Sequence, residues 1–142
     1  MAIDIRAMEA RDYDEAAALW SRTEGMGLSA SDSRESIEAF LRRNPGLSLV
    51  ARDGPDLVAA VLCGHDGRRG HLYHLAVAQT HRRKGLGRAL VDQCLAGLRS
   101  QGIRRCYLLL LNHNDAARAF YRALGWIAPD HCCLMAIDIL PR

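Results

Sequence analysis

The stretch from residue 70 to residue 111 constrains the fold most, because two strand patterns there flank a basic loop and a helical pattern. Residues 70–78 (GHLYHLAVA) predict one strand, and residues 104–111 (RRCYLLLL) predict a strand that is apolar on both faces. Between them, Leu86–Gln101 repeats apolar residues at helical spacing and is followed by Gly102, a common residue after a helix. The stretch therefore predicts a β-α-β unit.

The rest of the chain predicts helices and strands that follow one another closely. Two segments joined by a short turn at residues 53–55 indicate a hairpin. The pattern predicts strands in residues 2–8, 47–54, 56–67 and 131–140, and helices in residues 12–25, 31–46 and 114–126. Asp12 is expected as the N-cap of the first helix. Without a linker or a repeat, we expect one α/β domain, residues 1–142, with a mixed sheet.

The loop inside this unit, HRRKGLGRALV at residues 81–91, has the chemistry of an anion site. Glycines let the backbone approach a ligand closely, and the backbone N–H groups at the start of a helix attract negative charge. A Walker loop is excluded because the chain has no Lys-Ser or Lys-Thr, and the dinucleotide fingerprint would need a small residue where Leu90 stands. Either a phosphate group binds here, or the glycines only form a tight turn with solvated cations beside it.

Two motifs resemble those of one family. Residues 75–91 (LAVAQTHRRKGLGRALV) resemble the acyl-CoA-binding signature of the Gcn5-related N-acetyltransferases, and residues 112–126 (NHNDAARAFYRALGW) resemble that family's N-x-x-A-x-x-x-Y-x-x-x-G-[FW] helix. The resemblance covers essentially the whole chain. It implies a mixed, mostly antiparallel central sheet with flanking helices, and a V-shaped splay between the strands at 70–78 and 104–111. It also implies that acetyl-CoA is the co-substrate and that a primary amine attacks the acetyl group directly.

The resemblance also indicates which residues hold acetyl-CoA. The backbone of residues 75–77 would pair with the pantetheine arm, and the backbone of residues 83–88 would hold the pyrophosphate. The expected binding residues are Leu75, Ala76, Val77, Arg82, Arg83, Lys84, Gly85, Leu86, Gly87, Arg88, Asn114, Ala117 and Tyr121. Asn114 would bond the pantetheine, order the start of its helix, or both. Tyr121 would donate a proton to the departing thiolate, although the residue pattern alone also fits a core tyrosine.

The base that deprotonates the amine is less defined. Many members of the family have a glutamate on or beside the strand at 70–78, but this strand has no carboxylate. His71, His74 and Glu24 are therefore the candidate bases, because histidine titrates near neutral pH. The spacing of His71 and His74 predicts opposite faces of the strand, so that at most one of them faces the substrate. This spacing argues against a shared metal site, and no metal is expected.

Composition argues against two classes of protein, nucleic-acid-binding proteins and membrane-spanning proteins. The net charge is only +3 and the few aromatic residues do not interleave with the cations, which argues against a nucleic-acid-binding protein. No apolar run is long enough to span a membrane. An odd number of cysteines, five, in mostly apolar runs favours reduced thiols and a cytoplasmic location.

The alternative function is a non-catalytic acyl-CoA-binding sensor or adaptor. The resemblance implies a small-molecule or peptide amine as the acceptor, and a homodimer stays open because relatives are often dimers.

Overall fold

The computed structural model describes residues 3–140, which divide after Leu111 into two compact units. The first unit contains the strands β1 (Asp4–Ala7), β2 (Leu49–Asp53), β3 (Asp56–His65), β4 (Gly70–Val77) and β5 (Cys106–Tyr107). Its helices are α1 (Tyr13–Ser21), α2 (Arg34–Arg43) and α3 (Leu86–Ser100), with short 3₁₀ turns η1 (Ala10–Asp12), η2 (Ala30–Asp32) and η3 (Gln79–His81). The second unit contains α4 (Asp115–Ala123).

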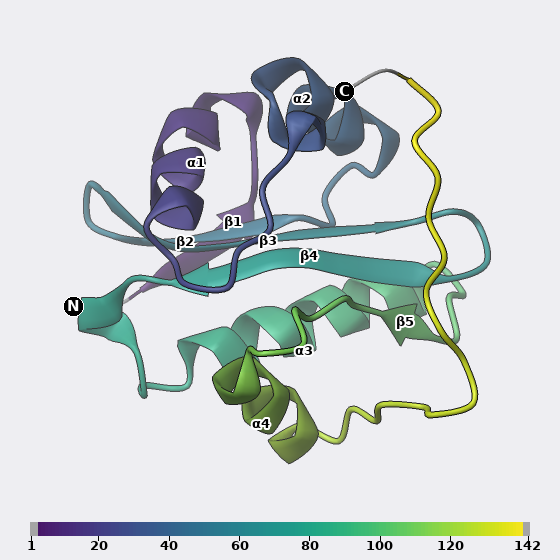
Figure 1. Ribbon diagram of the computed structural model, residues 1–142. Helices are drawn as coiled ribbons and strands as arrows, with labels where there is room; N and C mark the ends of the chain where they lie inside the picture. Colours follow the sequence, from purple (N-terminus) through teal and green to yellow (C-terminus); the bar gives the residue numbers. More distant parts are fainter. Residues whose placement is uncertain (1–2, 141–142) are drawn as a thin grey trace. The chain divides into compact units, whose positions relative to one another are not determined.

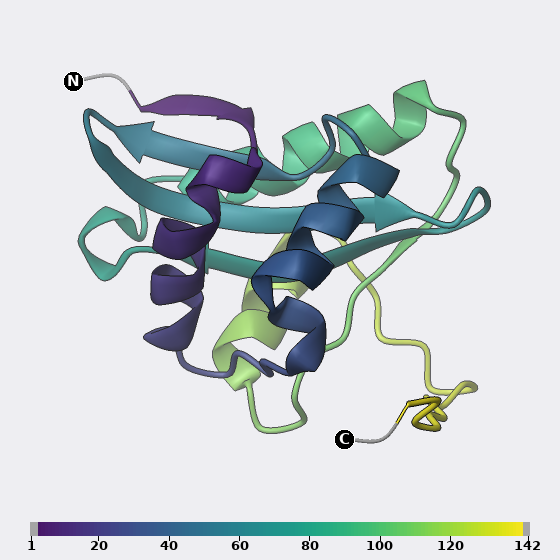
Figure 2. The same ribbon diagram turned by 90° about the horizontal axis from the view of Figure 1, so that it is seen from above.

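The five strands form one sheet in the order β1-β2-β3-β4-β5. Neighbours are antiparallel from β1 to β4, and β5 runs parallel to β4. Helices α1 and α2 cover one face of the sheet and α3 covers the other (Figures 1 and 2). This mixed, mostly antiparallel sheet with flanking helices confirms the predicted fold class.

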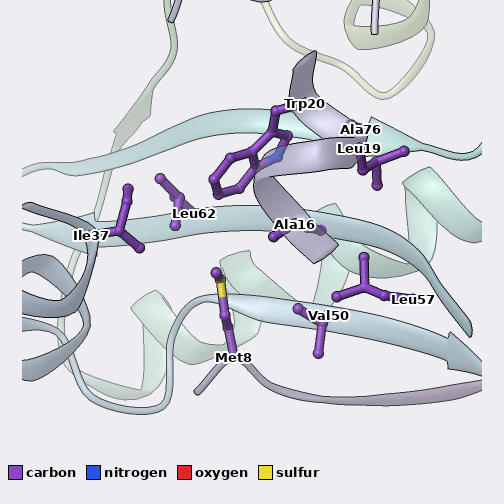
Figure 3. Close-up of a cluster of buried hydrophobic side chains, with 10 residues drawn as sticks. Met8, Ala16, Leu19, Trp20, Ile37, Val50, Leu57, Leu62 and Ala76 are labelled. Carbon is purple, nitrogen blue, oxygen red and sulfur yellow. The ribbon is translucent and has the colours of Figure 1, made fainter. Parts of the chain in front are cut away.

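The core between α1, α2 and the sheet follows from alternation along the strands. Leu62 and Val50 lie on this face, where Trp20 and Leu19 of α1 meet them (Figure 3). Ala60 of β3 belongs to the same buried cluster. Trp20 is only 1% exposed and is the largest fully buried side chain. This packing fixes α1, and the loop that leaves it, against the middle of the sheet.

An ion-pair network joins β1, β2 and the start of α1 around the fully buried Asp12. Its carboxylate accepts hydrogen bonds from Arg6 at 2.8 and 3.0 Å and from Arg52 at 2.9 Å. It also accepts the Glu9 N–H at 2.8 Å. Asp12 does occupy the N-cap position of α1, but its side chain makes no capping bond there, because the arginines and Glu9 take up its oxygens.

The two strands of the β-α-β unit diverge soon after they meet. β5 pairs with β4 only at Gly70–Cys106 and His71–Tyr107. The edge of β4 from Leu72 to Val77 therefore has no pairing with β5, in agreement with the expected splay. The prediction of a buried strand over residues 104–111 is wrong in extent, since Leu109 is 66% exposed and Leu111 is 42% exposed.

In the second unit, Asn114 precedes α4, and residues 127–140 contain neither helix nor strand. The predicted terminal strand in residues 131–140 is therefore wrong. An apolar sequence favours a strand only where a neighbouring strand offers hydrogen bonds, and no strand pairs with this segment among residues 3–140. The organisation of residues 1–142 as one domain stays a prediction. No helix within residues 3–140 is long and apolar enough to cross a membrane.

A substitution at Gly64 on β3 tests how closely α2 packs against the sheet. A Cβ added there would lie 2.6 Å from Cζ of Phe40 and 2.7 Å from Nδ2 of Asn44. We expect Gly64→Ala to lower the free energy of unfolding by about 1–3 kcal/mol in urea denaturation. Gly27→Ala is the control, because nothing lies within 4 Å of its added Cβ. Equal stability of the two variants would contradict this packing.

Candidate active site

The loop before α3 leaves backbone N–H groups exposed at a helix start. Gly85 is the N-cap of α3 in a left-handed conformation, with φ of +79°, and no side chain caps the helix. The first helical bond is donated by the N–H of Ala89 to the carbonyl of Gly85, at 3.0 Å. The N–H groups of Leu86, Gly87 and Arg88 precede that bond and have no acceptor within the helix. The geometry is that of an anion-binding helix terminus.

The same loop has free space beside Gly85. A Cβ built on Gly85 would meet no atom within 4 Å, so that the space beside the helix start is open. Arg83 also has a left-handed backbone, with φ of +64°, a conformation that turns neighbouring N–H groups inward. The side chains of Arg82, Arg83 and Lys84 are exposed. Three exposed cationic side chains therefore directly precede the N-cap of α3 in the chain.

The loop also contacts the open edge of β4. Arg82 donates from Nε to the carbonyl of Val77 at 3.0 Å, so the structure brings two of the predicted binding residues together. The N–H of Ala78 bonds Val58 on β3 at 2.7 Å, and successive residues of a strand face opposite edges. The N–H and C=O groups of Val77 therefore face the edge of β4 opposite β3, at a position where β5 no longer pairs with it. Within the part of the chain that the structure describes, no other strand pairs with β4 there.

A β-bulge changes the direction of His74. Ala60 pairs with Ala76 and Leu62 pairs with Tyr73, which leaves His74 and Leu75 together opposite Val61. His74 has φ of +55°. The bulge reverses the alternation, so the prediction that His71 and His74 lie on opposite faces is wrong.

Ring contacts define the shared face. The Tyr73 ring lies 6.0 Å from Phe40 of α2, and His71 stacks on Tyr73 with centroids 6.0 Å apart. His74 lies 5.3 Å from Trp20 of α1. All three β4 side chains thus face α1 and α2, because the bulge adds one residue between Tyr73 and Ala76.

His74 has the most defined environment of the three candidate bases. Its Nε2 lies 2.7 Å from Oδ1 of Asp32, and both side chains are 13% exposed. His71 contacts the rings of Tyr73 and Tyr107, both at 6.0 Å. Glu24 lies in the exposed turn after α1, and no hydrogen bond within residues 3–140 joins it to either histidine.

Sequence reasoning missed Asp32 as a partner of a candidate base. The Asp32–His74 contact spans 42 residues, and no periodicity predicts it.

Burial raises the pKa of Tyr73, which keeps the phenol beside these groups neutral. Among residues 3–140 no three or more His, Cys, Asp or Glu side chains are grouped to hold a metal ion.

Helix α4 carries the remaining predicted site residues. Asn114 is its N-cap and accepts the N–H of Ala117 through Oδ1 at 3.2 Å. The helix-ordering interpretation of Asn114 is therefore confirmed. Tyr121 is buried, and its ring meets Phe120 at 5.0 Å and Trp126 at 5.4 Å. These contacts pack the ring of Tyr121 between an aromatic side chain of α4 and one that follows the helix.

Comparisons with known proteins identify the family and agree with the fold. The sequence model described as the acetyltransferase (GNAT) family matches residues 13–126. An acetyltransferase of Pectobacterium atrosepticum is 30% identical over 128 residues, which are 90% of each chain. The structure resembles Ard1 from Thermoplasma volcanium, with a TM-score of 0.78 and 22% identity over 89% of this chain and 84% of that one. It also resembles the PaiA N-acetyltransferase from Thermoplasma acidophilum in complex with coenzyme A, with a TM-score of 0.76 and 20% identity over 92% of both chains.

Proposed function

The chain belongs to the acetyltransferase (GNAT) family, and from that membership we propose that it transfers the acetyl group of acetyl-CoA to a primary amine. The observation that carries the proposal is the uncapped start of α3, where open N–H groups and exposed cations suit a pyrophosphate. The open edge of β4 supports it, because an extended pantetheine arm needs a strand edge without a partner.

In this proposal the chain binds acetyl-CoA mainly through its backbone. Residues 83–88 would hold the pyrophosphate, and residues 75–77 would pair with the pantetheine. The bound co-substrate supplies the acetyl thioester. An N–H of Leu75 or Val77 would polarise the acetyl carbonyl, and holding amine and thioester together supplies much of the rate. Tyr121 would donate a proton to the departing thiolate.

His74 is the base that we favour among the three candidates. A base must be held in place relative to its substrate, and His74 is fixed by a bulge, a ring contact and a carboxylate. His71 makes ring contacts but no side-chain hydrogen bond within residues 3–140, and Glu24 lies in an exposed turn. The acceptor amine would then lie on the α1–α2 side of β4.

The test measures release of the CoA thiol from acetyl-CoA with tyramine, spermidine and a short peptide that has a free N-terminus and one lysine. We expect turnover of at least one amine and saturable binding of acetyl-CoA by calorimetry. Binding of acetyl-CoA without turnover of any amine, tested over a broader amine panel, would favour the non-catalytic sensor or adaptor instead.

Tyr121→Phe tests the proton donor. Losing a general acid lowers kcat by about 100-fold, while the affinity for acetyl-CoA should stay within about threefold because the ring remains. Tyr107→Phe is the matched control, since it removes a phenol hydroxyl from a side chain that is 42% exposed. An unchanged kcat in Tyr121→Phe would remove Tyr121 from the mechanism.

A further inference from the structure

We infer that Asp32 is a positioning residue that holds neutral His74 in the tautomer with its proton on Nε2. The ring nitrogen left to accept a proton from the amine is then Nδ1. This inference rests on the proposed function, because it takes His74 as the base. It assigns a role to Asp32 and names the reacting atom of His74.

The tautomer follows from the contact between the two side chains. Nε2 of His74 lies 2.7 Å from Oδ1 of Asp32. An ionised carboxylate can only accept hydrogen bonds, so the ring nitrogen facing it must carry a proton. In a neutral imidazole the other nitrogen then has the lone pair. No hydrogen bond from residues 3–140 reaches Nδ1 of His74, so no described residue occupies that lone pair as a donor.

Asp32 is held in place independently of His74. Its other carboxylate oxygen, Oδ2, accepts the N–H of Ser29 at 2.9 Å in the capping box of η2. Its backbone carbonyl accepts the hydroxyl of Tyr13 at 2.6 Å, which ties η2 to the first turn of α1. The carboxylate is therefore oriented before it meets the histidine, as a positioning group needs to be.

The surroundings of the pair make the contact effective. Both side chains are only 13% exposed, and the Trp20 ring lies against the imidazole with centroids 5.3 Å apart and a tilt of 56°. Little water competes for the hydrogen bond, so its electrostatic strength is greater than at the surface. The bulge fixes the backbone of His74 as well, with φ of +55°.

The experiment records the ¹⁵N signals of the His74 ring at a pH where the imidazole is neutral, in the wild type and in Asp32→Asn. An asparagine can still accept the Ser29 N–H through its oxygen, and its amide can donate to Nε2. The donation moves the proton of the imidazole to Nδ1 and removes the base atom. We expect the two ring signals to exchange character between the proteins.

The kinetic arm uses acetyl-CoA with whichever of tyramine, spermidine and the peptide turns over fastest. We expect Asp32→Asn to lower kcat about 100-fold at unchanged KM for acetyl-CoA. Adding His74→Asn to Asp32→Asn should cause no further loss, because the first change acts through the histidine. The control, Asp14→Asn, removes an exposed carboxylate that pairs with Arg34 on the same side of the sheet, and should leave kcat and the ring signals unchanged.

The outcomes distinguish failure of the role assigned to Asp32 from failure of the proposed acetyltransferase function. A wild-type His74 that carries its proton on Nδ1, or a tautomer that Asp32→Asn does not change, overturns the role of Asp32 whatever the kinetics show. A tautomer that changes while kcat stays constant shows that another group is the base, and overturns the catalytic role of the pair. If no amine turns over, the proposed function fails, and the ring signals of the wild type still test the Asp32–His74 contact.

Discussion

A Gly87→Glu variant is expected to fold normally and to bind acetyl-CoA about a thousandfold more weakly. Gly87 lies in the first turn of α3, two residues after the N-cap Gly85, among the N–H groups assigned to the pyrophosphate. A carboxylate about 4 Å from one phosphate charge costs about 4 kcal/mol at an effective dielectric constant of about 20. Calorimetric titration with acetyl-CoA measures the loss.

Stability separates this effect from misfolding. Gly87 has no positive φ, so that a side chain there needs no unusual backbone. Glutamate is a better helix former than glycine and interacts favourably with a helix N-terminus, so the variant should be slightly more stable, by about 0.5–1 kcal/mol. Gln93→Glu is the matched control, because it adds the same charge to an exposed position farther along α3. Normal acetyl-CoA binding by a folded Gly87→Glu protein would show that the cofactor lies elsewhere.

Asp12→Asn is expected to lower the free energy of unfolding by about 3 kcal/mol. The variant leaves Arg6 and Arg52 without their shared negative partner at a fully buried position. The two arginine side chains are 27% and 19% exposed, so water recovers part of the loss and the effect falls at the low end of the range for buried pairs. Urea denaturation at pH 7 measures it. Asp14→Asn, which breaks an exposed ion pair with Arg34, should cost less than about 1 kcal/mol.

The same carboxylate predicts how stability depends on pH. Burial alone would raise the pKa of Asp12, but hydrogen bonds from Arg6, the Glu9 N–H and Arg52 outweigh burial and lower the pKa to about 2. A carboxyl group with a lowered pKa contributes stability above its unfolded pKa, near 3.8, and that contribution is lost as the pH falls through about 2. We therefore expect the difference between wild type and Asp12→Asn to shrink between about pH 4 and pH 2. A constant difference over that range would show that charge is not the cause.

Local patterns in the sequence predicted much of the fold. The predicted helix Leu86–Gln101 and the observed α3 differ by one residue at the end, because the glycine loop and Gly102 mark both boundaries. The hairpin of β2 and β3 turns at Gly54, as predicted from the turn residues. These features depend on residues close together in the chain, and a single sequence records them directly.

The errors arose where the outcome depends on distant partners. Residues 104–111 are apolar throughout, but only Cys106–Tyr107 pairs with β4, because pairing depends on how far two strands stay together. The bulge at His74 contains no glycine and interrupts no pattern, so strict alternation placed His74 on the wrong face. Asp32 was missed for the same reason, since a contact over 42 residues requires the folded sheet. The roles of Tyr121, Glu24 and the histidines stay predictions.

The left-handed backbone of His74 also limits which amino acids the chain tolerates at this position. Glycine adopts this conformation freely, and asparagine, aspartate and histidine adopt it more readily than other residues. A glutamate or a β-branched residue would either strain the backbone by about 1–2 kcal/mol or remove the bulge. Without the bulge, the pairing of residues 75–77 with β3 would shift by one residue. Their side chains would then point to the opposite face of the sheet, and their N–H and C=O groups to the opposite edge of the strand. A substitution at position 74 would therefore change which backbone N–H and C=O groups of residues 75–77 lie at the unpaired edge of β4.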